Sequence, residues 1–326
     1  IGDSLKLWAE RYQGIASILN SVNSAVNMLT TKSEAFKTGA AKGLVAIRDA
    51  ITKNVIPVVR GLHAAFKNLP ILQPEEEISE TEVLALVDRD HPGLEGFAQA
   101  MEAGDLEAAR ASLAEHFATR ERPAVPPSEF PASGSGNSMI VLQASGAQAE
   151  TADAMWLNHI FSIRNSDVGK VETYQLGEEI DWLDNPSSGR SWILYLNQLN
   201  IVSKLAGIYR DTGDEKYATE AGDLVLTWTR QVPRWYGYTQ DGKMIASGME
   251  VRNRLCNCIA AYEVLRKSPS LTPEKHMAFW KLFITAAREL QTYAGVSYPG
   301  LIPAAVMFPE FSEHDQWLDS GVDDIH

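Results

Sequence analysis

The stretch from Ser191 to Ala218, SWILYLNQLNIVSKLAGIYRDTGDEKYA, decides the fold class of this 326-residue chain. Its apolar residues recur every three or four positions, which is the period of one face of an α-helix. Gly213 can adopt the left-handed conformation that ends a helix, and Asp214 can cap the next one. The pattern predicts a helix over Ser191–Tyr209, a tight turn and a second helix around Tyr217. The apolar residues of the first helix are Trp192, Leu196, Leu199, Val202, Ala206 and Tyr209.

The same arrangement of a helix followed by a short connection recurs along the rest of the chain. A helix is expected from about Gly248 to Arg266. Thr272-Pro273 is typical of another helix start, because threonine caps a helix and proline fits its first turn. Helices with short connections lie antiparallel, and such hairpins in series build a bundle, a solenoid or an α/α toroid. From Trp156 onward the chain is predicted to be helical, and its fold class is all-α.

Charge and composition divide the chain into three predicted parts. Residues 1–72 carry nine Lys or Arg against four Asp or Glu, although the whole chain has a net charge of −13. This segment is predicted to be a separate helical unit of unknown role. Residues 78–136 are predicted to hold a short helix pair, with Asp105 capping its second helix, and a loop rich in Pro, Ser and Gly. Residues 137–326 form the predicted main domain.

The overall composition excludes several classes of protein. Hydrophobic residues make up 45% and charged residues 22% of the chain, which is typical of a globular protein. The negative net charge argues against nucleic acid as a partner, since phosphate binding needs clustered Lys and Arg. No apolar run reaches the roughly 18 residues of a transmembrane helix. No signal peptide is visible at the start of the sequence.

Familiar metal, cofactor and nucleophile motifs do not occur in the sequence. The seven histidines form no His-x-x-x-His pair, so we predict no metal site. Without a glycine-rich nucleotide or phosphate loop we predict no cofactor, and without a Gly-x-Ser-x-Gly elbow no serine hydrolase. Cys256 and Cys258 lie two positions apart on a predicted helix and point in nearly opposite directions. They are interpreted as buried structural thiols.

Polar residues on two of the predicted helices give the candidate binding site. Glu250 and Arg254 stand one helical turn apart, which is the spacing of an ordinary surface ion pair. Arg254 and Asn257 share a helix face, so an alternative is that they line a cleft that recognises a carboxylate or a sulfate. The polar side of the predicted helix Ser191–Tyr209 supplies the other part of the candidate binding site. It carries Asn197, Asn200, Ser203 and Lys204.

Several segments together resemble the N-terminal α/α toroid of the heparinase II/III-like polysaccharide lyases. The resemblance covers roughly residues 78–326 and depends on the order and spacing of its motifs. In chain order the matching segments are Glu102–Arg110, Arg120–Pro123, Ile180–Trp182, Ser191-Trp192, Leu196-Asn197, Tyr209–Ala218, Met249–Val251, Arg254-Leu255 with Asn257, Leu271–Glu274, Phe308–Phe311 and Trp317. The implied fold is an incomplete α/α toroid of antiparallel helix hairpins.

The resemblance implies β-elimination on a polysaccharide that contains uronate, so the implied partner is an acidic polysaccharide or oligosaccharide. The reaction removes the proton next to the carboxylate and expels the 4-linked oxygen. It needs a group that neutralises the carboxylate, a base and an acid. In the family an Asn has the first role, and His and Tyr residues have the others. Here Asn197, Glu250, Arg254 and Asn257 are carried over as substrate-binding or scaffold positions, with Arg254 expected to contact the ligand's acidic group.

The sequence departs from the family where its chemistry is expected. The family's Leu-Asn-Arg-His run reads Leu196-Asn197-Gln198-Leu199 here, and the Asn expected before Phe308 is missing from Tyr293–Gly300. Relatives also carry a C-terminal β-sandwich, and this sequence ends at His326 before one. We therefore assign no catalytic residue and expect an incomplete or inactive lyase domain; the alternative is a non-catalytic carbohydrate-binding or helical scaffold domain. The family implies a periplasmic or secreted location.

Overall fold

The computed structural model describes residues 78–121, 146–232, 248–292 and 300–323. Contacts within the chain define two units, Ile1–Gln73 and Pro74–His326, and every described residue belongs to the second unit. The helical unit predicted for residues 1–72 and most of the loop predicted before residue 136 lie outside the described residues. The three-part division of the chain therefore stays a prediction.

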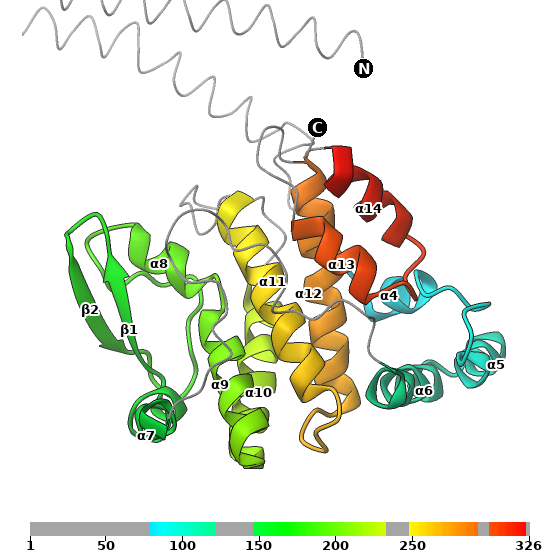
Figure 1. Ribbon diagram of the computed structural model, residues 1–326, viewed down its shortest axis with the longest axis horizontal. Coiled ribbons are helices and arrows are strands. Elements are labelled where there is room, and N and C mark those ends of the chain that lie inside the picture. Colours follow the sequence, from blue (N-terminus) through cyan, green and yellow to red (C-terminus); the bar gives the residue numbers. More distant parts are fainter. Residues whose placement is uncertain (1–77, 122–145, 233–247, 293–299, 324–326) are drawn as a thin grey trace, which may run out of the picture. The chain divides into compact units, whose positions relative to one another are not determined.

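Four helices form the centre of the described structure (Figure 1): α9 (Asn200–Thr212), α10 (Glu215–Gln231), α11 (Gly248–Leu265) and α12 (Pro273–Thr292). Helix α9 packs against α10 and α11, and α12 packs against the same two helices. The tight turn between α9 and α10 forms as predicted. Gly213 has a left-handed φ of 69°, and the Asp214 carboxylate accepts a hydrogen bond from the Lys216 amide. The all-α fold class is thus confirmed.

A buried group of aromatic rings joins the predicted helix pair to the central helices. The pair consists of α5 (Glu95–Ala103) and α6 (Leu106–Thr119), and the Asp105 side chain caps α6 by accepting from the Ala108 amide. Phe117 of α6 lies 5.4 Å from Trp280 of α12 and 5.9 Å from Phe308, measured between ring centres. Tilted aromatic pairs at such distances stabilise a core beyond the area that they bury.

The first and last described segments of the domain meet beside this aromatic group. Helix α4 (Glu80–Ala85) comes first in the chain, and α13 (Leu301–Met307) and α14 (His314–Asp323) come last, yet Figure 1 shows them together. An antiparallel bridge joins Val87 to Phe311. The Asp88 amide donates to the carbonyl of Glu310 at 2.8 Å. None of the described helices is long and apolar enough to cross a membrane.

The prediction that the chain is helical from Trp156 onward is wrong for one segment. After α7 (Gly146–Ala154) and a single 3-10 turn, β1 (Ile160–Asn165) pairs antiparallel with β2 (Lys170–Gln175). Burial alternates along β1, with Phe161 and Asn165 buried and Ser162 and Arg164 exposed, as on a strand with one buried face. The hairpin packs on the next helix, because Tyr174 lies edge-on to Trp192 with 5.2 Å between ring centres.

The single helix predicted over Ser191–Tyr209 is in fact two helices. Helix α8 (Ser191–Leu196) ends before Leu199, whose φ of 51° is left-handed, and α9 then begins at Asn200. The apolar period of the sequence continues across this break, because Leu199 is buried like Leu196 and Val202 on either side of it. A left-handed leucine costs about 1–2 kcal/mol, so contacts from elsewhere in the molecule must hold it.

Candidate functional site

A pocket of about 470 Å³ lies where β1, the break between α8 and α9, and the first turns of α11 meet. Its wall combines aromatic rings, side-chain amides and a few charged groups. The aromatic residues are Trp156, Phe161 and Tyr195; the amides are Gln198, Asn200, Asn253 and Asn257; the charged residues are Arg164, Lys204 and Glu250. A concave site with a small number of converging polar groups is the usual form of a small-molecule site.

Two cations give this pocket a positive character that the chain as a whole lacks. Lys204 of α9 places its Nζ 5.5 Å from the centre of the Trp156 ring, which is within the range of a cation–π contact. The removal of water from its ammonium group lowers the pKa of Lys204. Arg164 lines the pocket from the exposed side of β1. The described wall thus holds two cations and one carboxylate, that of Glu250.

Arg254 lies behind the pocket wall and is only 4% exposed. Its Nη1 donates to the carbonyl of Asn197 at 3.1 Å, and its Nη2 donates to Glu289 at 3.3 Å. Its guanidinium carbon lies 4.4 Å from the centre of the Trp228 ring. The Asn197 side chain, which is fully buried, accepts from Trp228 Nε1 at 2.8 Å. These contacts form one buried polar network.

This network explains how the chain tolerates the break between α8 and α9. Carbonyl groups at the end of a helix have no partner inside that helix. Here Arg254 satisfies the carbonyl of Asn197, and Asn257 Nδ2 donates to the carbonyl of Gln198 at 2.9 Å. Both donors come from α11. The side chains of α11 therefore fix the backbone that carries Gln198 and Leu199.

The structure brings the four predicted site residues together, but in two different environments. Glu250 and Asn257 line the pocket, whereas Asn197 and Arg254 hold the backbone behind it. The alternative of a solvated surface pair does not hold, since Glu250 and Arg254 are 5% and 4% exposed. The expected contact between Arg254 and a ligand is also not what the structure shows, because this guanidinium faces the Asn197 carbonyl and Glu289.

The remaining residues are those of the predicted polar face and the two cysteines. Asn200 and Lys204 of the predicted polar face line the pocket, while Ser203 is buried and donates to the carbonyl of Asn200. Cys256 and Cys258 are free and buried, as predicted for structural thiols. Burial raises the pKa of Cys256 to about 11, so it has little thiolate at neutral pH.

Sequence reasoning missed the wall of the pocket that the hairpin supplies. Arg164 and Phe161 enter the site from β1, and Trp156 from the turn before it. The short alternation of apolar and polar residues in Phe161–Arg164 is the signal that could have found the strand. The family's Asn is predicted to be missing from Tyr293–Gly300. Of this stretch, the structure describes only Gly300, so the prediction is not tested.

The comparisons with known proteins agree on one family. The model of the heparinase II/III N-terminus matches residues 83–326. The heparin-sulfate lyase of Bacteroides stercoris is 27% identical over 267 residues, which are 75% of this chain and 38% of that protein. The heparin-sulfate lyase of Pedobacter heparinus is 29% identical over 157 residues, which are 46% of this chain and 24% of that protein. The chain thus spans less than two fifths of these relatives.

Solved structures with a similar fold come from the same group. The crystal structure of heparan sulfate lyase HepC from Pedobacter heparinus has a TM-score of 0.62 and 24% identity, and the match covers 76% of this chain and 38% of that one. A crystal structure of heparinase III has a TM-score of 0.58 and 22% identity, with 75% and 37% covered. The likeness confirms the expected α/α-toroid fold class. The family match over most of its length shows that the chain belongs to the heparinase II/III family.

Proposed function

We propose that this domain binds an acidic, uronate-containing segment of a polysaccharide in the pocket between β1, α9 and α11. The observation that carries the proposal is that two cations, Lys204 and Arg164, and one carboxylate, Glu250, line a pocket rich in amides and aromatic rings. The relatives named heparin-sulfate lyases favour a sulfated or carboxylated sugar as the ligand class. They also favour the periplasmic or secreted location expected from the sequence.

The pocket wall offers a partner for each part of such a ligand. Lys204 and Arg164 would form charge-assisted hydrogen bonds with a carboxylate or a sulfate. The amide of Asn257 and the carboxylate of Glu250 would bond sugar hydroxyls, and Trp156 presents an apolar ring face. Asn197 and Arg254 would act from behind, by fixing the backbone of the pocket wall.

We further propose that this chain binds the sugar without cleaving it. Elimination needs a base and an acid close to one sugar ring. At the positions where the family has Arg-His, this chain has Gln198, a neutral amide, and Leu199, which is buried and cannot transfer a proton. This substitution is the observation that favours a non-catalytic carbohydrate-binding domain over an active lyase.

Calorimetric titration with uronate oligosaccharides from heparan sulfate tests the binding site. A charge-assisted contact contributes about 1.5–3 kcal/mol, so Lys204→Ala should weaken binding by about tenfold or more. Lys267→Ala is the matched control, because it removes the same charge from an exposed position just beyond the far end of α11. Equal affinity of the Lys204 variant, or equal binding of a neutral oligosaccharide, would contradict the proposed site.

The absorbance of unsaturated uronate products tests the absence of cleavage. Over hours at high protein concentration, we expect no product from heparan sulfate or from alginate oligosaccharides that the calorimeter shows to bind. Product formation with a rate proportional to protein concentration would refute the non-catalytic proposal and leave the binding proposal intact.

A further inference from the structure

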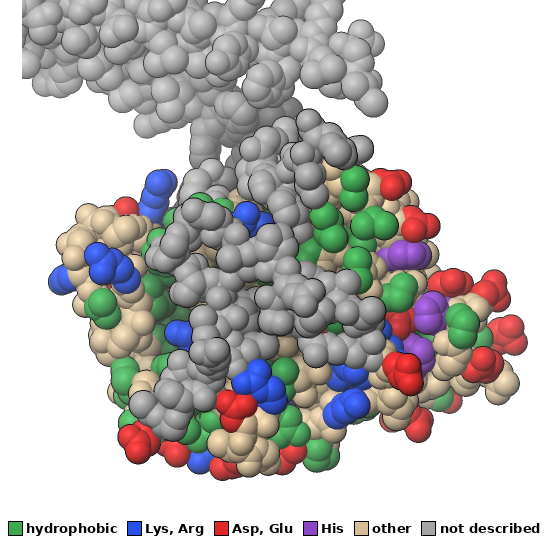
Figure 2. Space-filling model, viewed as in Figure 1, with side chains coloured by type: hydrophobic (Ala, Val, Ile, Leu, Met, Phe, Trp, Pro, Cys, Tyr) green, Lys and Arg blue, Asp and Glu red, His purple; other side chains and the backbone are tan. Residues whose placement is uncertain are grey.

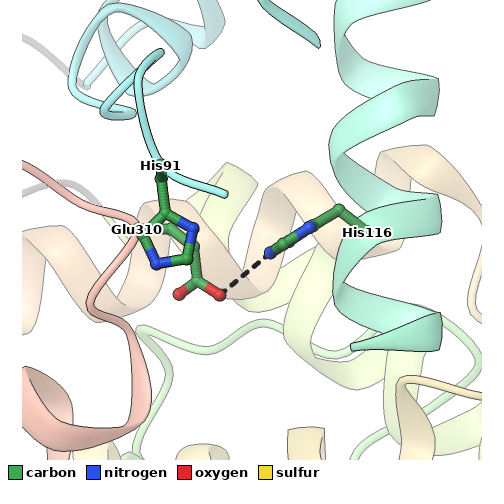
Figure 3. Close-up of side chains that lie close together, drawn as sticks. All are labelled: His91, His116 and Glu310. Carbon is green, nitrogen blue, oxygen red and sulfur yellow. Dashed lines mark hydrogen bonds and ion pairs between the residues drawn. The ribbon is translucent and has the colours of Figure 1, made fainter. Parts of the chain in front are cut away.

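A second group of polar side chains, away from the pocket, has the composition of a metal site (Figure 3). It consists of His91 from the loop before α5, His116 from α6 and Glu310 from the segment after α13. One ligand atom from each residue lies within 4.8 Å of the others. Figure 2 shows histidine side chains amid acidic ones on the surface formed by α4, α5, α6 and α14.

Hydrogen bonds orient both imidazole rings in the way that metal ligands are oriented. His116 Nδ1 lies 3.2 Å from the carbonyl of Gly93, and His91 Nδ1 lies 3.1 Å from the carbonyl of Pro92. A carbonyl oxygen only accepts, so each Nδ1 carries a proton. In the neutral ring this leaves the lone pair on Nε2. Histidines that bind metals commonly donate their other nitrogen to a backbone carbonyl in this manner.

The carboxylate of Glu310 is incompletely satisfied by the protein. The side chain is 1% exposed, and its Oε1 lies 3.1 Å from both His116 Nε2 and Arg120 Nε. Its Oε2 is buried and accepts no hydrogen bond from the described part of the chain. A buried acceptor without a partner costs about 1–3 kcal/mol. Moreover, Oε1 and a neutral Nε2 would face each other as two acceptors, so a proton or a cation belongs between these side chains.

We propose that His91, His116 and Glu310 bind a zinc ion. Two imidazole nitrogens and one carboxylate oxygen are ligands that Zn²⁺ prefers, and sites with three protein ligands keep water in the fourth position. Arg120 occupies Oε1, which leaves Oε2 for the ion. His91 is partly exposed and gives access from solvent. Bonds of about 2.0–2.2 Å require the ligand atoms, which lie within 4.8 Å of one another, to approach further when the ion binds.

The ion would act as a clamp between the two ends of the described domain. His91 and Glu310 come from the segments that meet through the Val87–Phe311 bridge and the bond from the Asp88 amide to the Glu310 carbonyl, and His116 adds α6. Sequence spacing gave no hint of it, because His116 and Glu310 are 194 positions apart. The proposal does not depend on the saccharide-binding function.

Zinc chloride titrated into the whole chain, freed of affinity tags and stripped with a chelator, tests the proposal. We expect one ion per chain by calorimetry and a raised melting temperature, since a ligand of the native state stabilises it. Calcium and magnesium should do neither, because they prefer oxygen ligands. His91→Gln should weaken zinc binding more than about tenfold, a factor that even the loss of an outer partner can produce.

His159→Gln is the matched control, because His159 makes the same kind of pair without a third ligand. Its Nε2 lies 3.1 Å from Glu220 and its Nδ1 faces the carbonyl of Gly177, but it belongs to no cluster of three metal ligands among the described residues. This variant should bind zinc as the parent chain does. An absence of zinc binding, unchanged binding by a folded His91→Gln chain, or an equal loss in both variants would overturn the site and leave a protonated His116–Glu310 pair.

Discussion

Two buried arginines near opposite ends of α11 have the same structural task, and Arg254 lies behind the wall of the candidate pocket. Arg254 donates to the carbonyl of Asn197 at the end of α8 and pairs with Glu289. Arg266 donates to carbonyls at the end of α6, including that of Phe117, and pairs with Glu263 at 3.2 Å. A buried arginine beside a glutamate is therefore not in itself evidence for a ligand site. Each one satisfies helix-end carbonyls that would otherwise lack a partner.

The two regions differ in the side chains that lie near the arginine. Near Arg254, Lys204 and Arg164 line a cavity. Near Arg266, the neighbours include Tyr262 and His276, which are buried in the aromatic core. The cations of the cavity wall are therefore the proposed ligand contacts, and the buried arginines stabilise the fold.

The largest effect on stability is expected from Arg266→Ala. Removing one partner of a buried ion pair costs about 3–5 kcal/mol, and here the carbonyls of α6 lose their donor as well. Urea unfolding should show this loss in the free energy of unfolding. A loss below about 1 kcal/mol would be typical of a surface pair and would contradict the account.

Arg254→Ala should cost about 3 kcal/mol for the same reason, and it should also weaken saccharide binding, because the pocket wall at Gln198 moves. Lys204→Ala should weaken binding while the free energy of unfolding changes by less than about 0.5 kcal/mol. Parallel unfolding and titration of the two variants separate the two roles. If Arg254→Ala abolished binding and left stability unchanged, Arg254 would be a ligand contact.

The Arg266 region should also respond to pH. Burial, and to a smaller extent the charge of Arg266, lower the pKa of His276 to about 4 from 6.5. The unfolded chain then binds a proton at a higher pH than the folded one, so the free energy of unfolding falls as the pH drops below 6.5. Between pH 7 and 5 we expect a loss of about 2 kcal/mol.

His276→Gln should flatten this pH dependence, and His159 provides the contrast. The hydrogen bond with Glu220 raises the pKa of His159, so its contribution is present below pH 6.5 and is lost as the pH rises through the raised value. His159→Gln should therefore remove the gain in the free energy of unfolding as the pH falls from that raised value to 6.5, and it should leave the fall below pH 6.5 unchanged. Identical pH profiles for the parent and the His276 variant would contradict the assignment.

Among the residues that hold the helix break, the smallest loss of stability is expected from Asn257→Ala. It leaves the carbonyl of Gln198 without a partner, which costs about 1–3 kcal/mol at a buried site. Asn253→Ala is the control, because Asn253 also lines the pocket and is only partly buried. The control should change affinity alone, as measured by titration and urea unfolding of both variants. Equal stabilities would mean that Asn257 does not hold the helix break.

The parts of the fold that follow from local chemistry were predictable from the sequence. Gly213 with Asp214, and Asp105 in the preceding helix pair, end and cap helices through their own backbone and side chains. The break at Leu199 was not predictable, because its donors come from α11 and leucine gives no signal for a left-handed conformation. The hairpin was not predicted, because the alternation in its first strand covers only Phe161–Arg164 and helical patterns follow it in the chain.

The candidate site was predictable only in part, because some of its contacts come from elements that are distant in the sequence. Glu250 and Asn257 were found because helical spacing places them on one side of α11. Arg164 reaches the pocket from a strand that the prediction lacked. Arg254 was assigned to a ligand because the sequence does not show that the carbonyl of Asn197 needs a donor.

The most direct test of this account is a crystal structure of the chain with a uronate oligosaccharide from heparan sulfate. We predict the acidic group of the sugar within about 3 Å of Lys204 Nζ, in the pocket between β1, α9 and α11, with Arg254 still bonded to the carbonyl of Asn197. A sugar bound outside this pocket, or an acidic group on Arg254 with the Asn197 contact broken, would contradict it.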